Sequence, residues 1–133
     1  MRVGPYEIVS ELGRGGMGVV YRARREDLGR AFALKVLAAG AEATPDTVAR
    51  FRREARAAAA LAGHPGVVAV HDVGEADGRV YLAMDLVEGP TLEAAIAAGE
   101  LTPRRAAEIV AAVARSVAAA HARGIIHRDL KPA

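Results

Sequence analysis

The chain has 133 residues, of which 52% are hydrophobic and 26% are charged, and its formal net charge is +2. This size and apolar content suit one soluble domain with a substantial core, and they do not suit two full domains. The absence of cysteine excludes a disulfide framework, a thiolate zinc site and a thiol nucleophile.

The charge pattern and the apolar runs narrow the choice of partners. The sixteen arginines are scattered among acidic residues and form no basic block, so we expect no nucleic-acid binding. No apolar run reaches the ~20 residues that cross a bilayer, and the first ten residues have no signal pattern. For this stretch we therefore expect no membrane segment and a cytoplasmic location. A full-length protein with an anchor beyond the stretch stays possible.

Three alternating segments in the first third of the chain predict strands, at residues 6–10, 19–24 and 32–37. Glycine-rich residues 13–18 separate the first two segments, and the turn-forming residues 26–30 separate the second from the third. The economical prediction is three antiparallel strands joined by tight turns.

A helix is expected next, with Thr44 or Asp46 as its N-cap and Pro45 in its first turn. Glycine and proline at residues 63–66 end it. Its apolar stripe consists of Val48, Phe51, Ala55 and Ala58. Two further strands are expected at residues 67–73 and 80–86, on either side of a turn at residues 75–78. Five strands and one helix predict a small α+β lobe.

The second part of the chain is alanine-rich and helical. Gly89-Pro90 is typical of a hinge, and a short helix should follow it. A long helix is then expected, opened by Thr102 and Pro103 and ended at Gly124. Its apolar stripe consists of Ile109, Val113, Val117 and Ala120. That stripe needs a partner to cover it.

The spacing Gly13-x-Gly15-x-x-Gly18 occurs both in dinucleotide-binding folds and in flaps over a triphosphate. In the dinucleotide fold a helix follows the glycines, and an acid lies about twenty residues further on. Here a valine-rich strand follows, and the region around Ala33 is apolar. The context favours a flap whose backbone can approach phosphates closely, with a plain glycine hairpin as the alternative.

Lys35 and Lys131 are the only lysines among eighteen basic residues. Alternation places Ala33 and Lys35 on one face of a strand, with a small residue for a flat ring beside a cation for phosphate. The alternative is that Lys35 lies on an edge strand, where a lysine prevents aggregation with another sheet. Glu54 lies in the first helix, and if it pairs with Lys35 it would fix the ammonium against the α- and β-phosphates. Otherwise it is an ordinary solvated acid.

The run from His127 to Pro132, His-Arg-Asp-Leu-Lys-Pro, is the most specific motif, and it resembles the catalytic loop of protein kinases. The order and spacing of the other motifs match the same family over essentially the whole chain. Those motifs are Gly13-x-Gly15-x-x-Gly18-x-Val20, Ala33-x-Lys35, Glu54 and His64-Pro65. The lysine two places after Asp129, Lys131, resembles the residue at that position in the serine/threonine class. The sequence of residues 12–21 is similar to that of bacterial kinases of the eukaryotic type.

The resemblance implies a kinase small lobe over residues 1–88, with a five-stranded antiparallel sheet and one helix that bind ATP. It implies that residues 89–133 begin a helical large lobe that is incomplete and stops within the catalytic loop. Its implied function is transfer of the γ-phosphoryl group of ATP to serine or threonine hydroxyls of proteins, with Mg²⁺.

The resemblance also assigns roles to particular residues. Leu12, Val20 and Ala33 would sandwich adenine under the flap formed by Gly13, Gly15 and Gly18. Met84 would be the gatekeeper residue of the adenine pocket. The backbone of Asp85 and Val87 would form hydrogen bonds with the edge of the adenine. Lys35, held by Glu54, would grip the α- and β-phosphates. Asp129 would accept or orient the substrate hydroxyl, Lys131 would steady the γ-phosphate, and Arg128 would read a phosphate on the activation loop.

The magnesium ligands of the family fall beyond Ala133, so we expect no metal ligand in these residues and no kinase activity from the 133-residue chain alone. Two alternatives stay open. One is an inactive nucleotide-binding or interaction fragment without turnover, and the other is a small-molecule phosphotransferase of related fold, which Lys131-Pro132 disfavours. The sequence leaves dimerisation undetermined.

Overall fold

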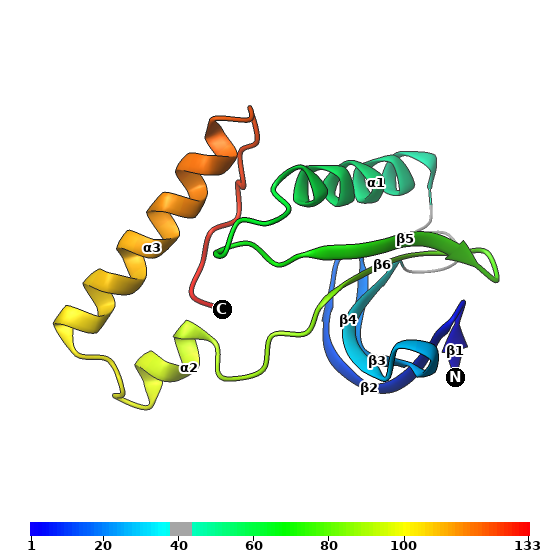
Figure 1. The fold of residues 1–133 in the computed structure, drawn as a ribbon, viewed down its shortest axis with the longest axis horizontal. Coiled ribbons are helices and arrows are strands. Elements are labelled where there is room, and N and C mark those ends of the chain that lie inside the picture. The colour runs from blue at the N-terminus through cyan, green and yellow to red at the C-terminus, as the bar shows by residue number, and fades with distance from the viewer. Residues whose placement is uncertain (38–43) are drawn as a thin grey trace. The chain divides into compact units, whose positions relative to one another are not determined.

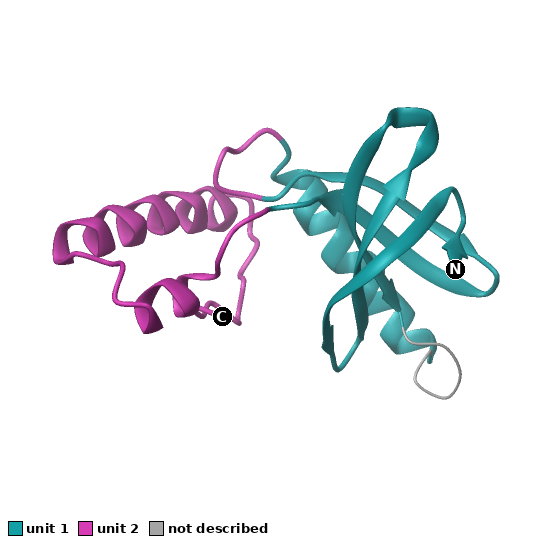
Figure 2. Ribbon diagram, turned by 90° about the horizontal axis from the view of Figure 1, so that it is seen from below, with its two compact units in different colours: residues 1–62, 68–87 teal, residues 63–67, 88–133 magenta. Residues whose placement is uncertain are grey.

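The computed structural model describes residues 1–37 and 44–133, which form two compact units (Figure 2). The first unit comprises residues 1–62 and 68–87 within the described part of the chain, and the second comprises residues 63–67 and 88–133. Segment 63–67 therefore belongs to the second unit, although elements of the first unit precede and follow it in the sequence.

The first unit is built on a six-stranded antiparallel sheet with the order β1-β2-β3-β4-β6-β5 (Figure 1). The strands are β1 (Arg2–Val3), β2 (Tyr6–Gly15), β3 (Gly18–Arg25), β4 (Arg30–Leu37), β5 (Val70–Ala76) and β6 (Arg79–Asp85). A single 3-10 turn, η1 (Glu26–Leu28), joins β3 to β4. The expected α+β fold is confirmed.

The strand count and several strand boundaries differ from the prediction. A sixth strand, β1, has only two residues and pairs with the start of β2, too short a segment to show an alternating pattern. Strand β2 continues to Gly15 through two irregularities of register, which break the alternation that the sequence would show. Strand β5 begins at Val70 rather than at residue 67 and ends at Ala76 rather than at residue 73, so it includes the first two residues of the turn expected at 75–78.

Two tight hairpins explain where the glycines lie. Gly15 pairs with Gly18, so the glycine-rich segment is the end of one hairpin and not a long loop between strands. The β5–β6 hairpin turns at Asp77 and Gly78, whose φ values of 51° and 70° are both positive. An Asp-Gly pair of this kind fits the type I′ turn that matches the twist of the flanking strands.

The sheet separates two apolar clusters. One contains Val3, Tyr6, Ala23, Phe32, Leu34, Val36, Tyr81 and Ala83. The other contains Leu37, Phe51, Ala55, Val80 and Leu82. Neighbouring residues of β6, such as Tyr81 and Leu82, fall into different clusters because successive side chains of a strand point to opposite faces. Among the described residues, the only buried side chains with a polar group in these clusters are Tyr6 and Tyr81, whose hydroxyls both donate to Asp72 Oδ2.

Helix α1 (Pro45–Ala60) packs through Phe51 and Ala55 on the second cluster (Figure 1). The two residues are four apart and therefore share one helix face. Thr44 is the N-cap, since its side chain accepts a hydrogen bond from the N–H of Thr47 at 3.2 Å. Of the two expected caps, the structure selects Thr44, with Pro45 in the first turn.

The second unit contains helices α2 (Leu92–Ala97) and α3 (Pro103–His121). Thr91 and Thr102 cap them, each accepting a backbone N–H at 3.1 Å. Beyond α3, Gly124 has a φ of 73°, the left-handed conformation expected of a helix stop. Of the predicted apolar stripe of α3, Ala120 is buried and Val113 is 43% exposed.

Candidate nucleotide-binding and catalytic residues

The glycines of the β2–β3 hairpin differ in their surroundings. Gly18 has a φ of 148°, and a Cβ there would lie 2.1 Å from the carbonyl oxygen of Val36. The fold itself therefore demands glycine at this position. A Cβ at Gly13, Gly15 or Gly16 would meet nothing within 4 Å, and none of the three has a positive φ. Packing within the described residues gives no reason for those three glycines.

Strand register brings several predicted residues to one face of the sheet. Val20 lies opposite Lys35 in the β3–β4 pair, and Met84 lies opposite Ala33 in the β4–β6 pair. Opposed residues of antiparallel strands share a face, and Ala33 and Lys35 share one because they are two apart. Val20, Ala33, Lys35 and Met84 therefore line a single face, three apolar side chains with one cation.

Leu12 lies at an irregularity of β2, between the register pairs of Glu11 and Gly13, and it is 50% exposed. Such a residue has no cross-strand partner, so its side chain is free of the ladder that orders its neighbours. At the tip beyond it, Arg14 folds back on Glu11 through two hydrogen bonds of 2.9 and 3.3 Å.

Lys35 forms an ion pair with Glu54, with Nζ 3.1 Å from Oε2. The ammonium also lies 5.6 Å from the centre of the Phe51 ring, close enough for a cation–π contact. The Lys35 side chain is 23% exposed and that of Glu54 is 46% exposed. Strand β4 lies between β3 and β6, so the edge-strand alternative for Lys35 is wrong.

Asp85 ends β6, and its N–H donates to the carbonyl oxygen of Ala69 at 2.9 Å. Its carboxylate contacts His71 and Arg30, and these partners lower the pKa of Asp85, the His71 hydrogen bond contributing most. Val87 follows two residues later and is 72% exposed. Neither Arg30 nor His71 was among the predicted site residues. Arg30 meets Asp85 only through the pairing of β4 with β6, and His71 reaches Asp85 from an irregular point of β5 that alternation does not reveal.

In the second unit, Lys131 and Asp129 form an ion pair of 3.1 Å. The N–H of Asp129 donates to Nδ1 of His127 at 3.1 Å, a short-range bond that shapes the loop. Between them, Arg128 has a φ of 67°, a left-handed conformation that is rare for a non-glycine residue. Backbone strain of this kind tends to occur at functional sites.

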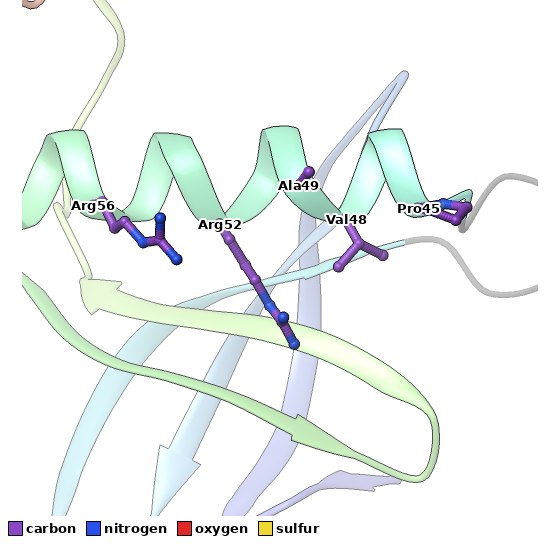
Figure 3. A pocket seen from close by; sticks show the side chains of 5 residues that line it. All are labelled: Pro45, Val48, Ala49, Arg52 and Arg56. Atoms are coloured by element: carbon purple, nitrogen blue, oxygen red, sulfur yellow. The ribbon is translucent and has the colours of Figure 1, made fainter.

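An open depression of about 540 Å³ lies along α1, lined by Pro45, Val48, Ala49, Arg52 and Arg56 (Figure 3). Arg52 reaches Glu75 of β5 at 3.6 Å. The lining includes none of the residues predicted to bind nucleotide or to act in catalysis.

The chain belongs to the protein kinase domain family, whose sequence pattern it matches over residues 6–133. It is 49% identical over 128 residues to the serine/threonine-protein kinase PknJ of Mycobacterium tuberculosis, covering 96% of this chain and 22% of that protein. It is 45% identical over 130 residues to the serine/threonine-protein kinase PknH of the same organism, covering 97% of this chain and 21% of that protein.

The fold agrees with that family. A crystal structure of the M. tuberculosis PknI kinase domain matches the whole chain with a TM-score of 0.80 and 37% sequence identity, and the match covers 54% of that structure. The chain spans about a fifth of the length of PknJ and of PknH. Among the described residues, no helix is both long and apolar enough to cross a membrane.

Proposed function

We propose that the protein carrying this chain is a serine/threonine protein kinase, and that this chain supplies its ATP-binding residues and part of its catalytic loop. The observation that carries the proposal is the Lys35–Glu54 ion pair, on the face that also holds Val20, Ala33 and Met84. A cation fixed beside a flat apolar surface suits a ligand with an aromatic base and a polyphosphate.

The nucleotide would be held by residues of the first unit. Val20, Ala33 and Leu12 would contact the base, with Met84 as gatekeeper at the back of the same face. Because the N–H of Asp85 already donates to Ala69, the carbonyl of Asp85 is the backbone group that it would offer to the base, followed by the backbone of Val87. Lys35 would neutralise the α- and β-phosphates, and Gly13, Gly15 and Gly18 would form the flap above them.

The open space around Gly13, Gly15 and Gly16 supports that flap. Glycine costs conformational entropy in a strand, so three glycines without a packing reason suggest a ligand that must approach the backbone closely. Side chains at these positions would meet the ligand first.

In the second unit, Asp129 would accept the proton of the substrate hydroxyl, or orient that hydroxyl, as its oxygen bonds to the γ-phosphorus and the bond to the β-phosphate breaks. Lys131 would steady the γ-phosphate, and its ion pair with Asp129 keeps the two groups together. Arg128 would bind a phosphate on the activation loop. Bound Mg²⁺ neutralises the developing phosphoryl charge in such enzymes, but no three acidic or histidine side chains in the described residues could hold a metal ion, so none of them is proposed as a ligand.

The test is phosphoryl transfer by the full-length protein. With magnesium and ATP labelled in its γ-phosphate, we expect label on serine and threonine of a generic basic protein. The Asp129→Asn variant should lose that transfer while still binding ATP. Nucleotide binding by the wild type without transfer would favour the alternative, a nucleotide-binding or interaction protein without turnover.

A further inference from the structure

Three side chains meet at the end of β6, and we call Arg30, His71 and Asp85 the Asp85 clamp. The Arg30 guanidinium contacts Asp85 Oδ1, and His71 Nε2 lies 2.6 Å from the same oxygen. Arg30 and His71 are themselves 3.5 Å apart. Arg30 starts β4 and His71 lies in β5, the two strands on either side of β6. The carboxylate of Asp85 is thus held from both neighbouring strands.

A local irregularity of β5 brings His71 into the clamp. The β5–β6 register passes from Val70 opposite Met84 to Asp72 opposite Ala83, so His71 has no residue opposite it. A bulge of this kind redirects a side chain. The carbonyl oxygen of Ala69, the residue just before β5, accepts a hydrogen bond from the N–H of Asp85 at 2.9 Å. The same stretch of chain around the start of β5 therefore holds both the backbone and the carboxylate of Asp85.

Phe32 restricts the two partners of Asp85. The Arg30 guanidinium carbon lies 5.2 Å from the centre of the Phe32 ring, and the His71 ring meets that ring edge-on with centres 5.5 Å apart. Phe32 is buried and lies opposite Asp85 in the β4–β6 pair. An isolated ion pair at a surface contributes little, because its side chains must be ordered at a cost in entropy. Here the shared aromatic ring already orders them.

We propose that Arg30 and His71 are positioning residues that hold Asp85, and through it the backbone of residues 85–87, in place for the base of the nucleotide. This inference rests on the proposed function, which assigns that backbone to the adenine edge. Neither side chain is assigned a contact with the nucleotide. Their loss should therefore weaken nucleotide binding and leave the rate of phosphoryl transfer at saturation nearly unchanged.

The positioning itself can be tested without nucleotide. Amide hydrogen exchange of residues 85–88 would be compared in the full-length wild type, Arg30→Gln and His71→Leu. Arg79→Gln is the matched control, since Arg79 is an exposed arginine at the opposite end of β6 whose guanidinium lies 4.0 Å from the sulfur of Met1. We expect exchange to be about threefold to tenfold faster in the two clamp variants and unchanged in the control. Unchanged exchange in the clamp variants would overturn the inference.

A second measurement connects the clamp to the nucleotide. For Arg30→Gln and His71→Leu we expect the KM for ATP to rise about threefold to tenfold, with kcat within about twofold of the wild type. His71→Gln, which keeps a hydrogen-bond donor, should recover much of the affinity. A wild type that binds ATP, with variants of unchanged KM, would refute the clamp alone. A wild type that binds no nucleotide would refute the proposed function, and with it the assignment of the clamp to a nucleotide site, whatever the exchange result.

Discussion

At the scale of single residues, Lys35 has the best-defined surroundings of the predicted site. Glu54 and Phe51 come from one face of α1, the first as an ion-pair partner at 3.1 Å and the second with its ring 5.6 Å from the ammonium. Because the Lys35 side chain is only partly exposed, water and salt screen its charge less than that of a surface lysine. The ammonium is thus oriented by the helix and not by its own flexible stem.

Replacement of Lys35 by methionine should abolish most phosphoryl transfer. Methionine keeps an unbranched stem against Phe51 but removes the cation proposed for the α- and β-phosphates. We expect kcat/KM of the full-length protein to fall by about a hundredfold to a thousandfold, the usual effect of losing one such charge. A thermal midpoint close to that of the wild type would be the folding control. Turnover equal to that of the wild type would contradict the assignment of Lys35.

Glu54→Gln should impair the same reaction less than Lys35→Met. Glutamine can still accept a hydrogen bond from the ammonium, so orientation of Lys35 weakens while its charge remains. We expect kcat/KM to lie between those of the wild type and Lys35→Met, measured in the same assay. A neutral effect would mean that Glu54 is an ordinary surface acid, despite its contact with Lys35.

Asp85 should titrate below its ordinary pKa of 3.8, because His71 and Arg30 favour the charged carboxylate. The clamp therefore contributes stability above about pH 4, and that contribution is lost as the pH falls through the lowered pKa of the folded protein. Carbon NMR titration should show the pKa of Asp85 rising toward 3.8 in His71→Leu. The pKa of Asp27, lowered chiefly by Arg25, should stay unchanged in that variant. A shift of Asp27 together with Asp85 would indicate a general disturbance of the sheet instead.

At the scale of elements, the end of the β2–β3 hairpin is packed on one strand and open on the other. On β3, Gly18 packs directly on the backbone of β4. Its partner Gly15 on β2, and Gly16 in the turn, have open space around them. A hairpin of this form can keep its register while its end approaches a ligand, because the positions that fix the fold are not those that face the open space.

Two alanine substitutions should separate these roles. Gly18→Ala places a Cβ against the Val36 carbonyl at a positive φ, so the free energy of unfolding should fall by about 1–3 kcal/mol. Gly16→Ala meets no neighbour and should leave stability nearly unchanged. Denaturant unfolding of both variants makes the comparison, and ATP binding by Gly16→Ala reports on the tip. Equal destabilisation by the two substitutions would contradict the division.

At the scale of the whole molecule, the proposed residues are divided between the two units. Lys35, Glu54, Met84 and Asp85 belong to the first, and Asp129 and Lys131 belong to the second. The proposed nucleotide contacts with the base and with the α- and β-phosphates come from the first unit. The chain belongs to the protein kinase domain family over residues 6–133, so both units derive from one family pattern.

Nucleotide binding should therefore raise the thermal stability of the full-length protein. A ligand present at a hundred times its dissociation constant stabilises the native state by about 2.7 kcal/mol, which corresponds to several degrees in Tm. We expect such a shift with magnesium and ATP, and a much smaller one in Lys35→Met. Differential scanning fluorimetry measures both. A shift of equal size in the two proteins would place the bound nucleotide away from Lys35.

The sequence by itself determined the family, the α+β class and most of the elements. The start of α3 at Thr102, the helix stop at Gly124 and the Asp77-Gly78 turn depend on contacts within a few residues, which local chemistry predicts. The common face of Ala33 and Lys35 follows from the period of two in a strand.

Only the tertiary structure decided which distant residues meet. The sequence left Glu54 as either a partner of Lys35 or a solvated acid, and the packing of α1 on the sheet settled that question in favour of the pair. The sequence pattern predicted neither strand β1 nor the Asp85 clamp. A two-residue strand has no period, and His71 reaches Asp85 only because a bulge breaks the alternation of β5. Such contacts depend on register between strands, which local propensity does not specify.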